Sequence, residues 1–157
     1  MVTVMSVEYF AYGSNIAEDV MAGISPRHRC LGVASLPGFR MAFTRRSVRT
    51  GTGVADVVPD AESTVWGVLY EIDDGDIAAL DRKEGNGWAY VRQPVVVRLG
   101  ADDVEHQAVT YVVAKKEPSE VPPDPEYLGG IISAARQRGL PDEYVAQMTS
   151  RRASLAS

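Results

Sequence analysis

The sequence predicts an α+β fold, a mostly β domain with short helices and a helical C-terminal region. The segment Thr64 to Ile72 is rich in β-branched and aromatic residues and carries the strongest strand signal in the chain. Residues 126–138 and 141–148, in contrast, have helical character. A length of 157 residues with 45% hydrophobic content suits one domain, 1–157, with a core over about 7–149.

The first element is a short apolar run, Val7 to Tyr12, which predicts a buried strand. Gly13, Ser14 and Asn15 follow it, and these residue types favour turns and helix N-caps. The next segment, 16–22, predicts a short helix. A strand, a tight loop and a helix in this order can point backbone N–H groups at a carboxylate or an oxyanion. From the local pattern alone, an ordinary strand-to-helix connection is the simpler explanation.

The middle of the chain predicts short strands separated by turns. Residues 31–45 divide into two strands at Pro37-Gly38, and a strand over 54–58 ends at Pro59-Asp60. After the 64–72 strand, two more are predicted over 90–99 and 106–114, with a turn around 100–103.

Helical segments are predicted between these strands and after them in the chain. A short helix over 76–81 follows an Asp73-Asp74 cap and is broken by Gly85-Asn86-Gly87. The proline-rich segment 117–125 predicts a rigid extended linker. Beyond it, a helix over 126–138 stops at Gly139, and a last helix starts at Leu140-Pro141-Asp142 and runs through Met148. We expect the tail, 150–157, to be frayed.

The composition of the chain indicates which classes of partner and which compartment to expect. A net charge of -5 with mixed signs argues against nucleic acid as the main partner. The single cysteine, Cys30, excludes an intrachain disulfide and fits a reducing compartment. No apolar run is long enough to cross a membrane, and the N-terminal segment 1–5 lacks the basic region of a signal peptide. We therefore expect a cytoplasmic protein.

Several chemistries have little support in the residues. The two histidines, His28 and His106, lie in no ligand-spaced cluster, so no metal site is predicted. Ser14 lacks the flanking glycines of a nucleophile elbow. Cys30 has no local partner for catalysis and suits a small buried residue.

Carboxylate chemistry remains open. Asp81 precedes Glu84 by three positions, so the two side chains can share one face of a helical turn. Glu84 comes directly before a glycine-rich break, which can place it at the rim of a cleft as a general base with a raised pKa. The alternative is a solvated Glu84 paired with Arg82 or Lys83.

Tyrosines recur near the expected strand and helix ends. They are Tyr12, Tyr90, Tyr111 and Tyr127. Each can present a phenol to a pocket, or can be a core aromatic with a satisfied hydroxyl.

Four landmarks resemble the γ-glutamylcyclotransferase-like (AIG2-like) family. They are the run Tyr-Phe-Ala-Tyr-Gly-Ser-Asn over 9–15, Trp-Gly-Val-Leu-Tyr over 66–70, Leu-Asp-Arg-Lys-Glu-Gly over 80–85 followed by Tyr90, and the C-terminal region from 122 to 144. They occur in the order of the family and span most of the chain. The resemblance is specific for the fold and less so for the substrate, because the fold hosts several γ-glutamyl specificities.

The resemblance implies a mixed β-barrel with short flanking helices, and an enzyme that releases 5-oxoproline from a γ-glutamyl amino acid or amide without a cofactor or a metal. It places the catalytic general acid/base at Glu84. Its substrate-binding residues correspond to Tyr12, Gly13, Ser14 and Asn15 and, less strictly in register, to Tyr90, Tyr111 and Tyr127. A homodimer is also consistent with it.

Two alternatives stay open. The first is a γ-glutamylamine cyclotransferase or a biosynthetic deprotecting enzyme. The shape of the leaving-group pocket would decide between these substrates. Trp88 and Arg92 are candidates to line this pocket, or they form the end of a surface strand. The second is a non-catalytic domain that binds a γ-glutamyl ligand.

Overall fold

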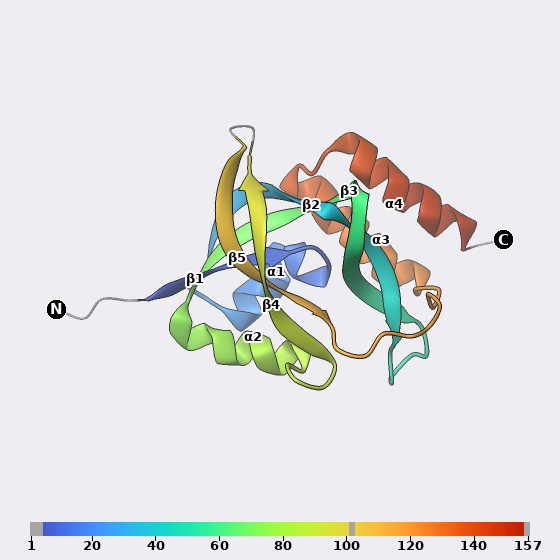
Figure 1. Ribbon diagram of the computed structural model, residues 1–157, viewed down its shortest axis with the longest axis horizontal. Helices are drawn as coiled ribbons and strands as arrows, with labels where there is room; N and C mark the ends of the chain where they lie inside the picture. The colour runs from blue at the N-terminus through green and yellow to red at the C-terminus, as the bar shows by residue number, and fades with distance from the viewer. Residues whose placement is uncertain (1–4, 101–102, 156–157) are drawn as a thin grey trace.

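A computed structural model describes residues 5–100 and 103–155 of the chain. Five strands form one mixed sheet, and helices flank it (Figure 1). The strands are β1 (Ser6–Ala11), β2 (Arg29–Arg46), β3 (Gly53–Asp73), β4 (Tyr90–Leu99) and β5 (Val104–Val113). The helices are α1 (Glu18–Ile24), α2 (Ile77–Glu84), α3 (Pro125–Arg138) and α4 (Asp142–Ser154), with 3₁₀ turns at Ser14–Ile16 and Asp74–Asp76. The predicted α+β fold is confirmed.

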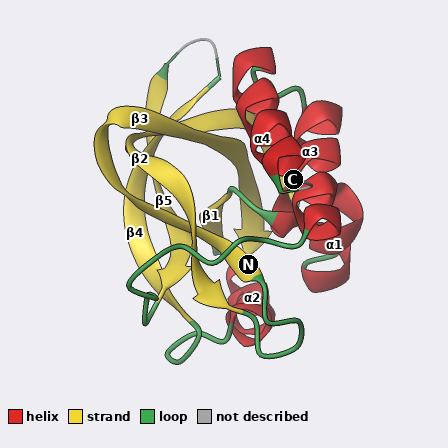
Figure 2. Cartoon of the chain, turned by 90° about the vertical axis from the view of Figure 1, so that its right-hand side faces the viewer, coloured by secondary structure: helices red, strands yellow, loops and turns green. Residues whose placement is uncertain are grey.

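The sheet closes into a barrel in the order β1-β3-β2-β4-β5. The neighbours pair antiparallel, except that β1 meets β5 in parallel at Tyr9 and Val109. Helices α1, α3 and α4 gather along one flank of this barrel, and α2 lies beneath one end (Figure 2). Strand β1 is therefore covered on both faces, which explains why consecutive residues Tyr9, Phe10 and Ala11 are all buried.

The two long strands correct the predicted turns. Pro37 and Gly38 lie inside β2, where the pairing with β3 shifts register between Pro37 and Phe39. Opposite this bulge, β3 continues through Pro59 and Asp60 instead of ending there. The proline and glycine signals thus mark an irregularity that bends a long ribbon, a role that bulges and strand glycines often have.

The helix boundaries differ in smaller ways. The first predicted helix is divided into the 3₁₀ turn and α1, which starts two residues later than expected. Asp73 caps the second helical region without a side-chain hydrogen bond. The tail was expected to fray from residue 150, but α4 continues to Ser154, where Arg151 and Arg152 bond to Glu120 and to the carbonyl of Pro125. The predicted turn at 100–103 is described only at Gly100 and Asp103; residues 101 and 102 lie outside the described part.

Gly67 allows β1 to end close to β3. A Cβ atom built at Gly67 would lie 2.1 Å from the carbonyl oxygen of Ala11, far inside van der Waals contact. Ala11 is the last residue of β1, and the loop that begins with Tyr12 follows it. The glycine therefore sets where this loop leaves the sheet.

Candidate active site

Residues from distant parts of the chain converge on one small cavity beside the end of β1. The lining contains all eight residues that the resemblance implicates: Tyr12, Gly13, Ser14, Asn15, Glu84, Tyr90, Tyr111 and Tyr127. The cavity measures about 40 Å³, room for about one water molecule. The structure thus brings the predicted residues together around a compact polar space.

The end of α2 places Glu84 at this cavity. Gly85 adopts the left-handed conformation, with φ of 63°, and stops the helix directly after Glu84. The amide of Asn86 then donates to the carbonyl of Asp81, as in a helix C-cap. A Cβ atom at Gly85 would lie 2.7 Å from the ring of Trp88, so both conformation and space favour glycine here. The helix break predicted from the glycines is confirmed.

Asn15 is the polar centre of the cavity. It is 2% exposed, and its Nδ2 donates to Glu84 Oε1 over 2.7 Å and to the Tyr9 hydroxyl over 2.8 Å. Its Oδ1 accepts a short hydrogen bond from the ammonium of Lys83. One amide side chain therefore bonds both the Glu84 carboxylate and the Lys83 ammonium.

Burial raises the pKa of Glu84 above its ordinary value, and the charge of Lys83 and the Asn15 hydrogen bond partly oppose this shift. Lys83 does not form an ion pair with Glu84, because its ammonium donates to Asn15 and to the Ser14 hydroxyl. Desolvation lowers the pKa of Lys83 itself. The geometry is that of a partly buried carboxylate poised to take up a proton, and the solvated alternative does not fit it.

Asp81 has a different environment from Glu84. Its Oδ1 accepts a 2.5 Å hydrogen bond from the Tyr111 hydroxyl and lies 3.4 Å from Nε of Arg92. These contacts engage Asp81 with Tyr111 and Arg92, so it orients the Tyr111 hydroxyl, and it is not among the residues that line the cavity. Arg92 is engaged by this pair and does not line the cavity, and neither does Trp88.

Two tyrosines bond to the backbone of one residue of β3, Ala55. The Tyr90 hydroxyl donates to the carbonyl of Ala55 over 2.7 Å, and the Ala55 amide donates to the Tyr127 hydroxyl over 3.1 Å. On the other side of the cavity, the Tyr12 hydroxyl donates to the carbonyl of Tyr111. Burial raises the pKa of the phenols of Tyr12, Tyr90, Tyr111 and Tyr127, so all four are neutral near pH 7.

The loop offers backbone donors to the same space. Within the described residues, no acceptor is bonded to the amides of Gly13, Ser14 or Asn15, whereas the next amides bond back to the loop. Gly13 has φ of -121°, outside the positive range that favours glycine. A Cβ atom there would lie 3.8 Å from the Ala55 Cβ on the cavity wall, an ordinary contact.

Sequence reasoning missed two lining residues, Tyr9 and Ala55. Tyr9 lies inside the apolar run of β1, and its pattern predicts only a buried core residue. Ala55 contributes its peptide group, for which no side-chain signal exists. The buried carboxylate of the next residue, Asp56, was also missed. It accepts hydrogen bonds from Thr44, from Lys116 and from two backbone amides, which indicates a structural role.

Comparisons with known proteins show the family of this chain. A sequence model of the AIG2-like family matches residues 64–148, more than half of the chain. The chain belongs to the AIG2-like family. This AIG2-like protein is 30% identical over 148 residues to bovine gamma-glutamylcyclotransferase, covering 90% of this chain and 77% of the bovine protein. It is 31% identical over 144 residues to the mouse gamma-glutamylcyclotransferase, covering 87% and 73% of the two chains.

A solved structure of a gamma-glutamyl cyclotransferase shares the fold of this AIG2-like protein. The TM-score is 0.85 at 28% identity, over 92% of this chain and 87% of the other. The resemblance drawn from the four sequence landmarks is therefore confirmed, and so is the prediction that the chain is an enzyme of this type.

No group of three or more potential metal ligands occurs among the described residues. The two histidines each face a glutamate, His28 on Glu18 and His106 on Glu8. Among the described helices, none is both long and apolar enough to cross a bilayer.

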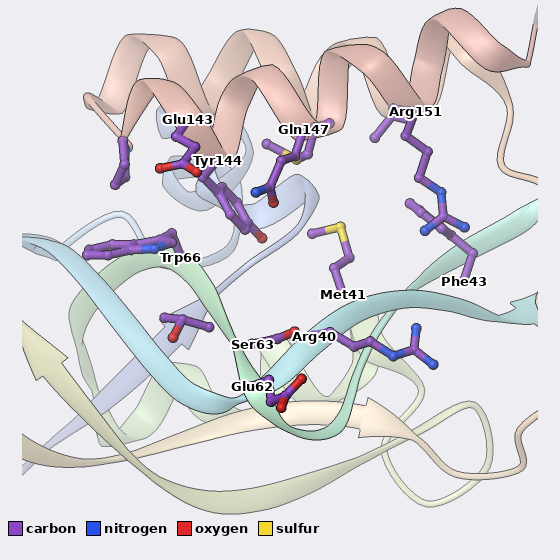
Figure 3. Close-up of a pocket in the computed structure, with 14 residues that line it drawn as sticks. Arg40, Met41, Phe43, Glu62, Ser63, Trp66, Glu143, Tyr144, Gln147 and Arg151 are labelled. Carbon is purple, nitrogen blue, oxygen red and sulfur yellow. The ribbon is translucent and has the colours of Figure 1, made fainter.

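A second pocket, of about 500 Å³, lies between α4 and strands β2 and β3. Figure 3 shows Met41 and Trp66 of the strands on one side and Tyr144 and Gln147 of α4 on the other. None of the predicted site residues lines it. The smaller cavity, in contrast, contains a carboxylate whose pKa is raised by burial, Glu84.

Proposed function

We propose that this protein releases 5-oxoproline from a γ-glutamyl compound, with Glu84 as the general acid/base. The observation that carries the proposal is the Glu84 carboxylate, partly buried at the cavity and oriented by Asn15. The names of the relatives support the same reaction type. A raised pKa suits a group that must accept a proton and return it near neutral pH.

The reaction needs one carboxylate and a bent substrate. The α-ammonium of the γ-glutamyl group gives a proton to Glu84, and the free amine then attacks the γ-carbonyl carbon. A C–N bond forms and the carbonyl oxygen becomes an oxyanion. When the oxyanion collapses, the original amide C–N bond breaks and Glu84 gives its proton to the departing nitrogen. The ring nitrogen then loses its second proton to the regenerated Glu84 carboxylate, which passes it to the free amine, so that a neutral lactam, an ammonium and ionised Glu84 remain. Such intramolecular attacks reach effective molarities of about 10⁵ M or more, so holding the conformer supplies much of the rate.

The backbone amides and the phenols of the cavity can bind the charged and polar groups of a γ-glutamyl substrate. The free amides of residues 13–15 can hold the oxyanion or the α-carboxylate. The buried neutral phenols around the cavity can donate hydrogen bonds without adding charge. The cavity holds about one water molecule, so the side chains that line it must move apart before a γ-glutamyl group can enter.

The experiment that tests the proposal is a substrate panel. Purified protein is incubated with γ-glutamyl amino acids, γ-glutamylamines and glutathione, and 5-oxoproline is quantified by mass spectrometry. We expect release from at least one class, with one amine formed per 5-oxoproline. A γ-glutamyl ligand that binds, as measured by calorimetry, while no panel member gives product would favour the non-catalytic alternative.

The pH dependence gives a second test. The rate requires ionised Glu84, so kcat/KM rises with pH through the raised pKa of this carboxyl, above the ordinary range of a glutamate. The Asn15 hydrogen bond lowers that pKa, so Asn15→Ala should move the acid limb to higher pH and reduce kcat. Asn86→Ala, which removes only the side chain that accepts from the Arg92 amide, is the matched control and should leave the limb in place. An acid limb that stays or moves to lower pH in Asn15→Ala would contradict the assignment.

A further inference from the structure

Arg45 lies near the site with its charge unused. It is partly buried in β2, next to the register shift between Phe43 and Arg45. Its guanidinium carbon lies 5.4 Å from the centre of the Trp88 ring, a cation–π contact. Among the described residues it has no ion pair and no side-chain hydrogen bond. The adjacent Arg46, by comparison, donates to the carbonyl of Gly51.

Trp88 ties this guanidinium to the active-site cavity. The Trp88 ring packs against Gly85, the residue after Glu84, and its amide donates to the Gly85 carbonyl. The ring is nevertheless 67% exposed, an unusual position for such a large apolar group. The charge of Arg45 also acts on the hydroxyl of Tyr90, a cavity residue, and lowers its pKa against the effect of burial. Arg45 and Trp88 thus form an open cationic platform beside the cavity.

The nearby carboxylates do not neutralise this platform. Asp81 is paired with Arg92, Asp56 with Lys116, and Glu84 is bonded to Asn15. A partly buried guanidinium without an anion favours a carboxylate ligand, which can accept two parallel hydrogen bonds from its N–H groups. In a γ-glutamyl amino acid, the departing amine carries such a carboxylate one carbon away from the breaking bond.

Building on the proposed function, we infer that Arg45, held by Trp88, binds the carboxylate of the leaving amino acid. The substrate class is then γ-glutamyl amino acids, and γ-glutamylamines are poor substrates because they lack this carboxylate. Trp88 is a positioning residue, since it acts through Arg45.

The test compares three substrates that share the γ-glutamyl group. γ-Glutamylalanine carries the carboxylate, γ-glutamylalaninamide replaces it with a neutral amide, and γ-glutamylethylamide lacks it. We expect wild-type kcat/KM to favour γ-glutamylalanine by roughly 10- to 100-fold over the other two, the range for a charge-assisted hydrogen bond. In Arg45→Gln this ratio should fall about tenfold or more, mainly through a higher KM for γ-glutamylalanine. Trp88→Ala should lower it less, and Arg46→Gln, the matched control, should keep it.

The outcomes separate the inference from the proposed function. Equal wild-type rates on all three substrates would overturn the inference and leave the cyclisation intact. An equal loss on all three in Arg45→Gln would also overturn it, because Arg45 would then serve the shared γ-glutamyl group. No 5-oxoproline from any substrate would overturn the proposed function, and the inference with it.

Discussion

Glu84→Gln lowers kcat for 5-oxoproline release by about 10²- to 10⁴-fold, the range for loss of a general acid/base. Glutamine keeps the size of the side chain and an oxygen that can accept from Asn15, so the cavity stays assembled. What disappears is the group that takes the proton from the α-ammonium and returns it to the leaving amine. Steady-state kinetics with the best panel substrate measures the effect.

The same variant should not lose stability. The pKa of Glu84 is raised in the folded state, so the stabilising contribution of this group is present below its unfolded pKa and is lost as pH rises through the folded pKa. At neutral pH the buried charge therefore costs free energy, and Glu84→Gln should unfold at the same or a higher urea concentration. Glu143→Gln, at the second pocket, is the matched control and should keep full activity. Near-normal turnover by Glu84→Gln would refute the catalytic assignment.

Gly67→Ala should destabilise the protein by about 3 kcal/mol or more, since a core cannot absorb a contact of this kind without moving backbone. The new Cβ would lie 2.1 Å from the carbonyl oxygen of Ala11, and a backbone atom cannot rotate aside as a side chain can. Because Ala11 precedes the loop over residues 12–15, activity should fall together with the free energy of unfolding. Urea unfolding followed by circular dichroism gives that free energy.

Gly130→Ala is the control for this glycine. Gly130 lies in the middle of α3, where an added Cβ meets no atom within 4 Å. Alanine there should stabilise the helix by about 0.5–1 kcal/mol. If Gly67→Ala proved as stable as the wild type, the close approach of β1 and β3 would be wrong.

The local sequence patterns predicted the elements whose signals are local. The apolar run of β1, the strand pair 90–99 and 106–114, and the stop of α2 at Gly85 all depend on residues close in the chain, and they were predicted well. The Pro37-Gly38 and Pro59-Asp60 signals were misread as strand ends. These two irregularities lie opposite each other in the β2–β3 ribbon, and pairing across many residues overrides the turn preference of each.

The candidate site shows the same division. Glu84 and the loop over 12–15 were named from their residue types and from the family resemblance. The hydrogen bond between Asn15 and Glu84 joins positions 69 residues apart. The hydrogen bond from Lys83 to Asn15, which Lys83 makes in place of an ion pair with Glu84, is also long-range. Tyr90 and Tyr127 bond to the backbone N–H and C=O of Ala55, and backbone groups give no residue-type signal in the sequence. Contacts of this kind follow from the closed barrel and not from any one segment.

The measurement that tests the central claim most directly is product analysis in ¹⁸O-labelled water. The account holds that the α-amine of the substrate attacks its own γ-carbonyl, so water takes no part in bond formation. We expect 5-oxoproline without ¹⁸O, in equal amount to the released amine. Glutamate carrying one ¹⁸O in its γ-carboxylate would show hydrolysis and would contradict the account.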